Sequence, residues 1–312
     1  MIYFFTAAAK FAPMRLYLKD WGAPLRRRVR IVAYEERPDP AAFPDASFVF
    51  ADVDRLPPEA TAIAVALWEG LAVRGERVRL LNDPRRALRR FALLRRLHQE
   101  GWNRFDVRRP GELRAGLRYP VFVRHALEHQ GAYTPLLRDE AELDAALARL
   151  RAAGHEDAAL MIVEFLDTRC PDGLYRKYAA TIVGERILAH HVMFGREWEV
   201  KGSPLREPRL AEEERAFQLA HPHEARLRDL FALAEIGYGR VDYAVLDGAL
   251  QVWEINTNPT LLMPPRSYAP ERMPAKQWFS ARLNEALLAI DDRPAGRRGW
   301  LGRLFGAPGA AC

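Results

Sequence analysis

The last third of the chain carries the clearest pattern of apolar and polar positions. Residues Val241 to Leu246 form an apolar, β-rich run, Asp247-Gly248 is a dipeptide typical of a tight turn, and residues Leu250 to Ile255 form a second apolar run. This pattern predicts a β-hairpin. Polar residues interrupt each predicted strand, and these residues are the first candidates for chemistry.

The polar side chains of this hairpin are expected to converge. Glu254 and Asn256 are two positions apart, so both leave the same face of the second strand. Asp242 lies five residues before the turn and Glu254 six after it, which makes them near cross-strand partners. Two carboxylates and an amide oxygen beside Arg240 suit Mg²⁺, which usually also binds substrate phosphates. The alternative is a hairpin whose acidic side chains face solvent.

The first part of the chain alternates between strand-like and helix-like patterns, which implies a small open parallel sheet. Residues 1–28 show no clear period. Asp52 and Asp54 follow a strand, at the edge where such sheets bind ligands, although they could equally cap the following segment. The predicted elements are strands at 29–34, 47–51 and 77–81 and a helix at 57–74.

The middle and the end of the chain contain further helices and strands. An amphipathic helix is predicted from Arg85 to Gln99, where Gly101 stops it. The basic tail, residues 292–312, is expected to be flexible. The other predicted elements are strands at 119–124 and 159–166, a hairpin over 173–194, and helices at 139–153, 212–236 and 274–291.

Composition limits the classes of function. The chain has 312 residues, of which 49% are hydrophobic and 28% charged, enough for one large core or two to three lobes. Two cysteines, Cys170 and Cys312, argue against a disulfide framework and fit the cytoplasm. No apolar run approaches the length of a membrane span, and the apolar start lacks the basic region typical of a signal peptide.

The charge balance is dominated by arginine. The net charge is +6, with 42 Arg and five Lys against 41 acidic residues. We attribute the arginine excess to coding composition rather than to nucleic-acid binding, and we expect no nucleic-acid partner. An arginine-rich surface does suit polyanionic ligands such as ATP.

The hairpin resembles the metal-binding signature of a known superfamily. Gly239-Arg-Val-Asp, followed by Glu254-Ile-Asn-x-x-Pro259, looks like the signature of the ATP-grasp enzymes, which include D-alanine:D-alanine ligase, glutathione synthetase and ligases that add glutamate to protein tails. The resemblance implies that Asp242, Glu254 and Asn256 hold two Mg²⁺ ions, which Mn²⁺ could replace, on the phosphates of ATP. It also implies that Arg240 lies over an acyl-phosphate intermediate.

The same resemblance implies phosphate contacts elsewhere in the chain. Arg90, on the helix before Gly101, and Arg124, at the end of a strand, take the places of phosphate-binding cations. The loop 125–133 follows Arg124 and contains Gly131, as does the flexible loop that closes over the phosphates in the family. Lys201 stands where the family has a second phosphate-contacting lysine.

The adenosine contacts implied by the resemblance lie after the apolar strand 159–166. The backbone of Glu164 and Leu166 is expected to bind the adenine edge, and an acidic side chain shortly afterwards the ribose hydroxyls. Asp167 or Asp172 could bind the ribose hydroxyls, and we assign Asp167 to this role.

The substrate side of the predicted site departs from the family. We assign Arg176, on the first strand of the hairpin over 173–194, as a second catalytic residue beside Arg240. The ligases that add amino acids usually carry a further arginine on this strand, where this chain has Ala179 or Ala180. The identity of the substrate therefore does not carry over.

Two pairs of histidines admit more than one interpretation. His125 and His129 are four apart and could be metal ligands, but no third ligand accompanies them, and we interpret both as loop residues. One of His190 and His191 is expected to face the site, because neighbours in a strand alternate. A structural role for both is the alternative.

These observations lead to one predicted function with two alternatives. The predicted class is α/β (α+β) with the ATP-grasp fold: an N-terminal domain at 1–84, two lobes at 85–165 and 166–291 that grip ATP, and the tail. The predicted activity is a cytoplasmic, ATP- and Mg²⁺-dependent carboxylate–amine ligase that releases ADP, without stable membrane association and with a homodimer as an option. The alternatives are a kinase or ester-forming enzyme of the same fold, or a non-catalytic nucleotide-binding module.

Overall fold

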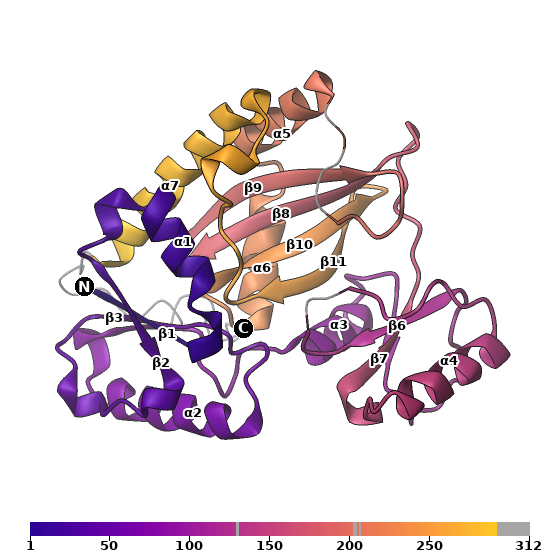
Figure 1. Cartoon of the computed structure of the whole chain (residues 1–312), viewed down its shortest axis with the longest axis horizontal. Coiled ribbons are helices and arrows are strands. Elements are labelled where there is room, and N and C mark those ends of the chain that lie inside the picture. Colours follow the sequence, from indigo (N-terminus) through magenta and orange to yellow (C-terminus); the bar gives the residue numbers. More distant parts are fainter. Residues whose placement is uncertain (129–130, 202–204, 206, 292–312) are drawn as a thin grey trace, which may run out of the picture.

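Three β-sheets, each backed by helices, form the part of the chain that the computed structural model describes, residues 1–128, 131–201, 205 and 207–291 (Figure 1). The strands are β1 Ile2–Thr6, β2 Val29–Ala33, β3 Ser47–Phe50, β4 Arg79–Leu81, β5 Val107–Arg108, β6 Val121–His125, β7 Leu160–Glu164, β8 Tyr175–Val183, β9 Arg186–Gly195, β10 Tyr238–Leu246 and β11 Ala249–Asn256. The α-helices are α1 Ala12–Asp20, α2 Pro58–Ala72, α3 Arg90–Gln99, α4 Glu140–Ala152, α5 Pro208–Ala220, α6 Glu224–Ala234 and α7 Met273–Asp291.

The N-terminal sheet is parallel, as predicted, with the order β2-β1-β3-β4. Its inner strand β1 and the helix α1 lie within residues 1–28, where the sequence shows no clear period and no element was predicted. All five residues of β1 are buried, because strands flank it and its two faces are covered. Such a strand shows no alternation of apolar and polar residues, which explains why the pattern did not reveal it.

The two other sheets are antiparallel. The smaller has the order β5-β7-β6 and the larger β11-β10-β8-β9, which includes both predicted hairpins. In Figure 1 the smaller sheet lies with α3 and α4 to the lower right, and the larger sheet lies above it with α5, α6 and α7. Each sheet falls inside one of the predicted domain ranges, and the boundaries themselves stay predictions.

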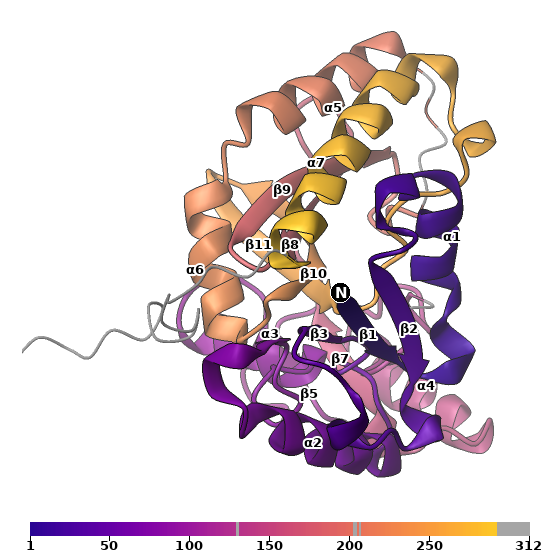
Figure 2. The ribbon, with the colours of Figure 1, turned by 90° about the vertical axis from the view of Figure 1, so that its left-hand side faces the viewer.

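Helix α7 joins the large sheet to the N-terminal sheet (Figure 2). Its residues Phe279 and Leu283 are fully buried in a core that also contains Phe4 and Tyr17 of the N-terminal layer. The Tyr17 hydroxyl donates to the Ser280 carbonyl at 3.1 Å. Burial of large apolar and aromatic side chains on both sides of α7 therefore fixes the N-terminal sheet against the large one.

Helix α3 begins at Arg90 rather than at the predicted Arg85. The Asp83 carboxylate accepts the backbone N–H of Arg85 at 3.0 Å, which favours a turn there. The N–H of Leu88 donates to the Ala234 carbonyl, also at 3.0 Å, so a tertiary contact holds this segment outside the helix. The shift places Arg90 on the first turn of α3.

Within the described ranges, no helix has the length and apolar character that crossing a bilayer requires. The predicted flexible tail, residues 292–312, lies outside the described residues.

Candidate functional site

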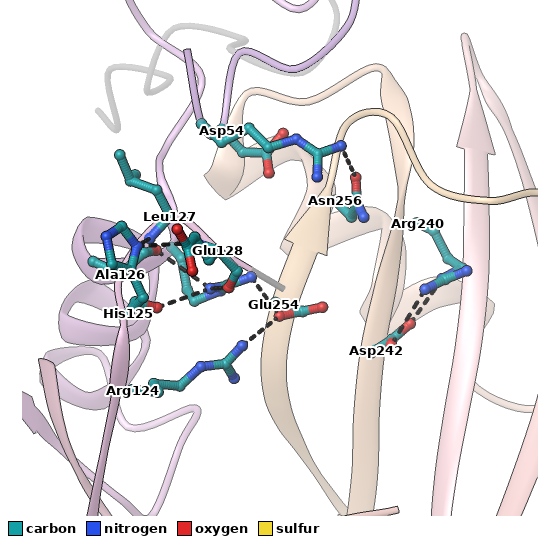
Figure 3. Close-up of polar contacts among 12 residues, drawn as sticks. Asp54, Arg124, His125, Ala126, Leu127, Glu128, Arg240, Asp242, Glu254 and Asn256 are labelled. Atoms are coloured by element: carbon teal, nitrogen blue, oxygen red, sulfur yellow. Dashed lines mark hydrogen bonds and ion pairs between the residues drawn. The ribbon is translucent and has the colours of Figure 1, made fainter. Parts of the chain in front are cut away.

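The predicted hairpin forms as β10–β11, with the predicted Asp-Gly turn. Asp242 pairs directly with Glu254, and Arg240 pairs with Asn256 on the same two strands. The turn residues Asp247 and Gly248 have φ values of 49° and 76°, which is the left-handed backbone of a two-residue hairpin turn. A bulge follows Asp242, where the register shifts by one residue. Figure 3 shows Asp242, Glu254 and Asn256 on neighbouring strands, with Arg240 beside Asp242.

Two arginines from the smaller lobe hold Glu254. Nη2 of Arg90 lies 2.6 Å from Glu254 Oε2, and Nη2 of Arg124 lies 3.2 Å from the same oxygen. Arg90 is 3% exposed, and burial lowers its pKa to about 10 although Glu254 acts to raise it. Arg90 is therefore still a cation at neutral pH. Its Nη1 group donates to the carbonyls at the base of the predicted phosphate loop, those of His125, Ala126 and Glu128.

Asp242 and Asn256 also contact cations. Nε of Arg240 donates to Asp242 Oδ1 at 2.9 Å, and Nζ of Lys177 lies 3.5 Å from Asp242 Oδ2. Nη2 of Arg55, from the N-terminal domain, donates to Asn256 Oδ1 at 3.4 Å. Each of the three predicted metal ligands thus accepts from at least one cationic side chain.

The chemistry of these oxygen donors fits a hard divalent cation. Two carboxylates and an amide oxygen are ligands that suit Mg²⁺ or Mn²⁺. Across the described ranges, three or more His, Cys, Asp or Glu side chains nowhere gather in a way that could hold a metal ion. A metal at this hairpin would therefore need further oxygens, which substrate phosphates and water usually supply to Mg²⁺.

A cavity between the two antiparallel sheets ends at this hairpin. Its lining combines apolar and aromatic side chains with charged ones. Trp198 packs on Phe122 with ring centroids 4.9 Å apart. The apolar lining includes Phe122, Met161, Leu166, Trp198 and Trp253, and the charged lining includes Arg124, Lys177, Asp242 and Glu254.

The predicted phosphate loop reaches across the cavity to the opposite lobe. The N–H of Ala132 donates to Glu199 Oε1 at 2.8 Å, and Lys201 Nζ lies 3.1 Å from the same atom. Gly131 has φ of +94°, and a Cβ there would come within 2.6 Å of Lys201 Cε. The backbone conformation favours glycine at this position, while a side chain would displace the flexible ends of Lys201 and Glu199.

The base of this loop is ordered by a histidine. Nδ1 of His125 accepts the N–H groups of Leu127 and Glu128, both at 3.1 Å. Figure 3 shows His125, Leu127 and Glu128 grouped in this way. His125 is thus the last residue of β6, and its ring contacts the start of the loop; His129 lies outside the described residues.

Comparison with solved structures identifies the architecture. A D-alanine–D-alanine ligase from Bacillus anthracis superposes with a TM-score of 0.54 at 14% identity, over 93% of this chain and 96% of that one. The same ligase complexed with ATP gives 0.50 at 14% identity, over 91% and 97%. A RimK domain protein, ATP-grasp, from Sphaerobacter thermophilus gives 0.51 at 17% identity, over 89% and 99%. The chain has the ATP-grasp fold. No protein-family model and no curated protein matches the sequence.

Four of the implied ATP contacts lie at the cavity of this ATP-grasp fold: Arg124, Gly131, Leu166 and Lys201. Arg90 is not among the lining residues; it contacts Glu254, which is. Their contacts with ATP stay predictions.

The two acidic residues of the implied adenosine site have other partners here. The N–H of Glu164 donates to the Asp106 carbonyl at 3.0 Å, and its carboxylate accepts from Arg118 at 2.7 Å. The backbone N–H of Glu164 is therefore already engaged. Asp167 is exposed and accepts the N–H of Arg169 at 3.0 Å.

Arg176 lines the cavity but is held by two carboxylates. Its Nε lies 2.6 Å from Glu213 Oε1, and its Nη2 lies 2.8 Å from Asp172 Oδ2. The hydrogen bonds from Arg176 hold the pKa of Asp172 well below its usual range. Asp172, the alternative ribose ligand, is thus engaged by Arg176.

Sequence reasoning missed two cations of the site, Lys177 and Arg55. Alternation along β8 separates Lys177 from Arg176, and the pairing of Ala179 with Asp242 places Lys177 on the face of the sheet that carries Asp242. The pairing of β8 with β10 joins two hairpins, so it cannot be predicted from the periodicity of either strand. Arg55 follows Asp52 and Asp54, and its Nε donates to Asp52 Oδ1 at 2.8 Å.

Proposed function

We propose that this protein is an ATP- and Mg²⁺-dependent carboxylate–amine ligase, which forms an amide bond through an acyl phosphate and releases ADP. One observation carries the proposal: Asp242 and Glu254 face each other across β10 and β11, both line the same cavity, and each is held by two cations. The likeness of the fold to a D-alanine–D-alanine ligase, also solved with ATP, supports it.

The charge at the hairpin favours a polyanionic ligand. Four cations contact two carboxylates, so the cluster carries more positive than negative charge. A triphosphate with its metal ion would replace these ion pairs. The metal would bind the carboxylates, and the phosphates would bind the cations that the carboxylates release. Arginine is well suited to this exchange, since its guanidinium binds carboxylate and phosphate with the same geometry.

The apolar lining of the cavity suits a purine ring. Phe122, Trp198 and Leu166 supply flat or aliphatic surfaces, and ligand pockets typically combine such surfaces with a few polar groups. We therefore propose that adenine packs on these surfaces and that the phosphates lie beside the charged side chains of the hairpin.

The proposed mechanism rests on positioning and charge rather than on a nucleophile of the protein. Asp242, Glu254 and Asn256 would hold Mg²⁺, which neutralises phosphate charge when bound. Arg124 and Lys201 hold the phosphates, and the loop at Gly131 excludes water from them. Arg240 stabilises the negative charge that develops at the transferred phosphoryl group.

The two steps balance as follows. An oxygen of the substrate carboxylate forms a bond to the γ-phosphorus while the bond to the leaving oxygen of ADP breaks. An amine then forms a bond to the acyl carbon, inorganic phosphate leaves with its electron pair, and the amine nitrogen loses a proton. The product is lighter than the sum of the two substrates by one water.

The test is ADP release with Mg²⁺ and ATP over a panel of amino acids, dipeptides and hydroxy acids, with mass spectrometry of the products. The expected result is release that depends on one carboxylate and one amine together. A phosphorylated product without condensation would identify a kinase and overturn the proposal. Full turnover by an Asp242→Ala variant would overturn the metal assignment.

A further inference from the structure

Two adjacent histidines on β9 differ in what their rings contact. His190 is the extra residue of a bulge, because His191 pairs with Ala179 while Ala189 pairs with Ala180. Nδ1 of His190 lies 3.0 Å from Thr181 Oγ1, and its ring stacks on Phe279 with centroids 3.8 Å apart. His190 is therefore a satisfied core residue.

His191 is buried but lacks such a partner. It is 6% exposed, and its Nε2 atom is buried without a hydrogen bond to any residue that the structure describes. A buried polar atom of this kind destabilises the fold, and native proteins keep few of them. Such an atom can bind a ligand if its position on the sheet brings it to the site.

The position of His191 connects it to the site. His191 pairs with Ala179, Ala179 pairs with Asp242, and Asp242 pairs with Glu254, so these residues form one row across four strands. Residues directly opposite one another share a face of a sheet. The residue between His191 and Asp242 is an alanine, whose side chain is a single methyl group.

The charges around His191 select the kind of ligand. Burial lowers the pKa of His191 well below its usual value, and His190, Arg240, Lys276 and Lys177 act in the same direction. The imidazole is therefore neutral at physiological pH, with cationic side chains around it. This environment repels an ammonium group and attracts an oxyanion, to which a neutral Nε2–H can donate.

We propose that His191, together with Lys177 and Arg240, forms an oxyanion subsite for a carboxylate group of the substrate, on the β9 side of the hairpin. The inference rests on the proposed function in one respect. Lys177 and Arg240 both contact Asp242 here, and a divalent cation on Asp242 would free them for the substrate.

The direct test follows the ¹⁵N signal of His191 Nε2 by NMR in the full chain, with Mg²⁺ and a non-hydrolysable ATP analogue bound. Acetate serves as the oxyanion probe, methylammonium as the cationic probe, and sodium chloride as the ionic-strength control. We expect a saturable shift of this signal with acetate, and none with methylammonium or sodium chloride. The absence of that shift while the analogue binds overturns the subsite and leaves the proposed function intact. Failure of the analogue to bind with Mg²⁺ contradicts the proposed function, and the subsite with it.

Variants of His191 give a second test, because the same substitution should increase stability and weaken substrate binding. His191→Leu removes the unsatisfied atom, so it should raise the melting temperature while raising the KM of the carboxylate substrate about tenfold, with the KM of ATP unchanged. His191→Gln keeps a polar group near Nε2 and should restore part of the binding. His98→Gln, on α3, is the matched control. A His191→Leu variant that loses stability and keeps the wild-type KM overturns the proposal.

Discussion

Two carboxylates of this protein, Glu214 and Glu254, have nearly the same local partners and very different surroundings. Glu214 on α5 lies 2.5 Å from Lys276 Nζ and 2.6 Å from Arg272 Nη2. Glu254 likewise accepts from Arg90 and Arg124. Glu214 is fully buried, whereas the side chain of Glu254 is 13% exposed and lines the cavity.

The comparison shows that access, rather than the ion pair itself, separates a structural cluster from a candidate site. Lys276 is 3% exposed, and burial lowers its pKa while Glu214 opposes that shift. Its charge can only be compensated from within the protein. Glu254 and Arg124, by contrast, line a cavity, where the phosphates of a ligand could replace the carboxylate on Arg124.

The largest effect is expected for Glu214→Gln. Removing this charge leaves Lys276 buried without its partner, which should lower the free energy of unfolding by about 3–5 kcal/mol. Urea unfolding followed by circular dichroism measures the loss. The double variant Glu214→Gln, Lys276→Met removes both charges and should recover much of it. A Glu214→Gln variant as stable as the wild type would contradict a structural role.

The next effect concerns pH, through two buried histidines whose pKa values are lowered in part by cations of both regions. Burial lowers the pKa of both His190 and His191, and Arg240 from the site and Lys276 from the structural cluster add to it. The unfolded chain therefore binds protons that the folded chain does not. Stability should be level above about pH 6.5 and fall below it, by up to about 1.4 kcal/mol per pH unit for each histidine.

Urea unfolding between pH 8 and pH 5 measures this dependence. His191→Leu should reduce the slope, because one of the two groups no longer takes up a proton on unfolding. A slope that is unchanged in this variant would show that His191 is not kept neutral by the fold.

The smallest effect on global stability is expected for Gly131→Ala, which disturbs the site alone. A side chain at φ of +94° costs about 1–2 kcal/mol and displaces Lys201 or Glu199. ATP affinity should fall, while the Glu214 cluster is untouched. The matched control is Gly116→Ala, where φ is also positive (77°) but nothing lies within 4 Å of the added Cβ. Equal losses of ATP affinity in both variants would contradict a specific role for the docked loop.

The sequence predicted those parts of the site that lie within one hairpin. The Asp-Gly turn sets the register of the pairs beside it, so Asp242 and Glu254 could be predicted as near cross-strand partners, whereas the bulge that brings them directly opposite each other was not predicted. The parallel arrangement of the first sheet also followed from the order of strands and helices. Strand β1 did not, because a strand that is buried throughout has no polar face.

The remaining contacts depend on elements far apart in the chain. Lys177 reaches Asp242 through the pairing of β8 with β10, and Arg55 reaches Asn256 from the N-terminal domain. Glu214 and Lys276 meet only because α5 packs beside α7. Neither periodicity nor motif spacing encodes such pairings, since each is decided by tertiary packing.

The most direct test of the central claim is calorimetric titration of ATP with and without Mg²⁺. The wild type should bind ATP more tightly with Mg²⁺. Asp247→Asn, which removes a charge from the turn of the same hairpin and keeps a residue that tolerates positive φ, should behave like the wild type. Glu254→Gln should lose most of the gain from Mg²⁺. A Glu254→Gln variant that keeps the full gain would contradict the account of Glu254 as a metal ligand released by its arginines.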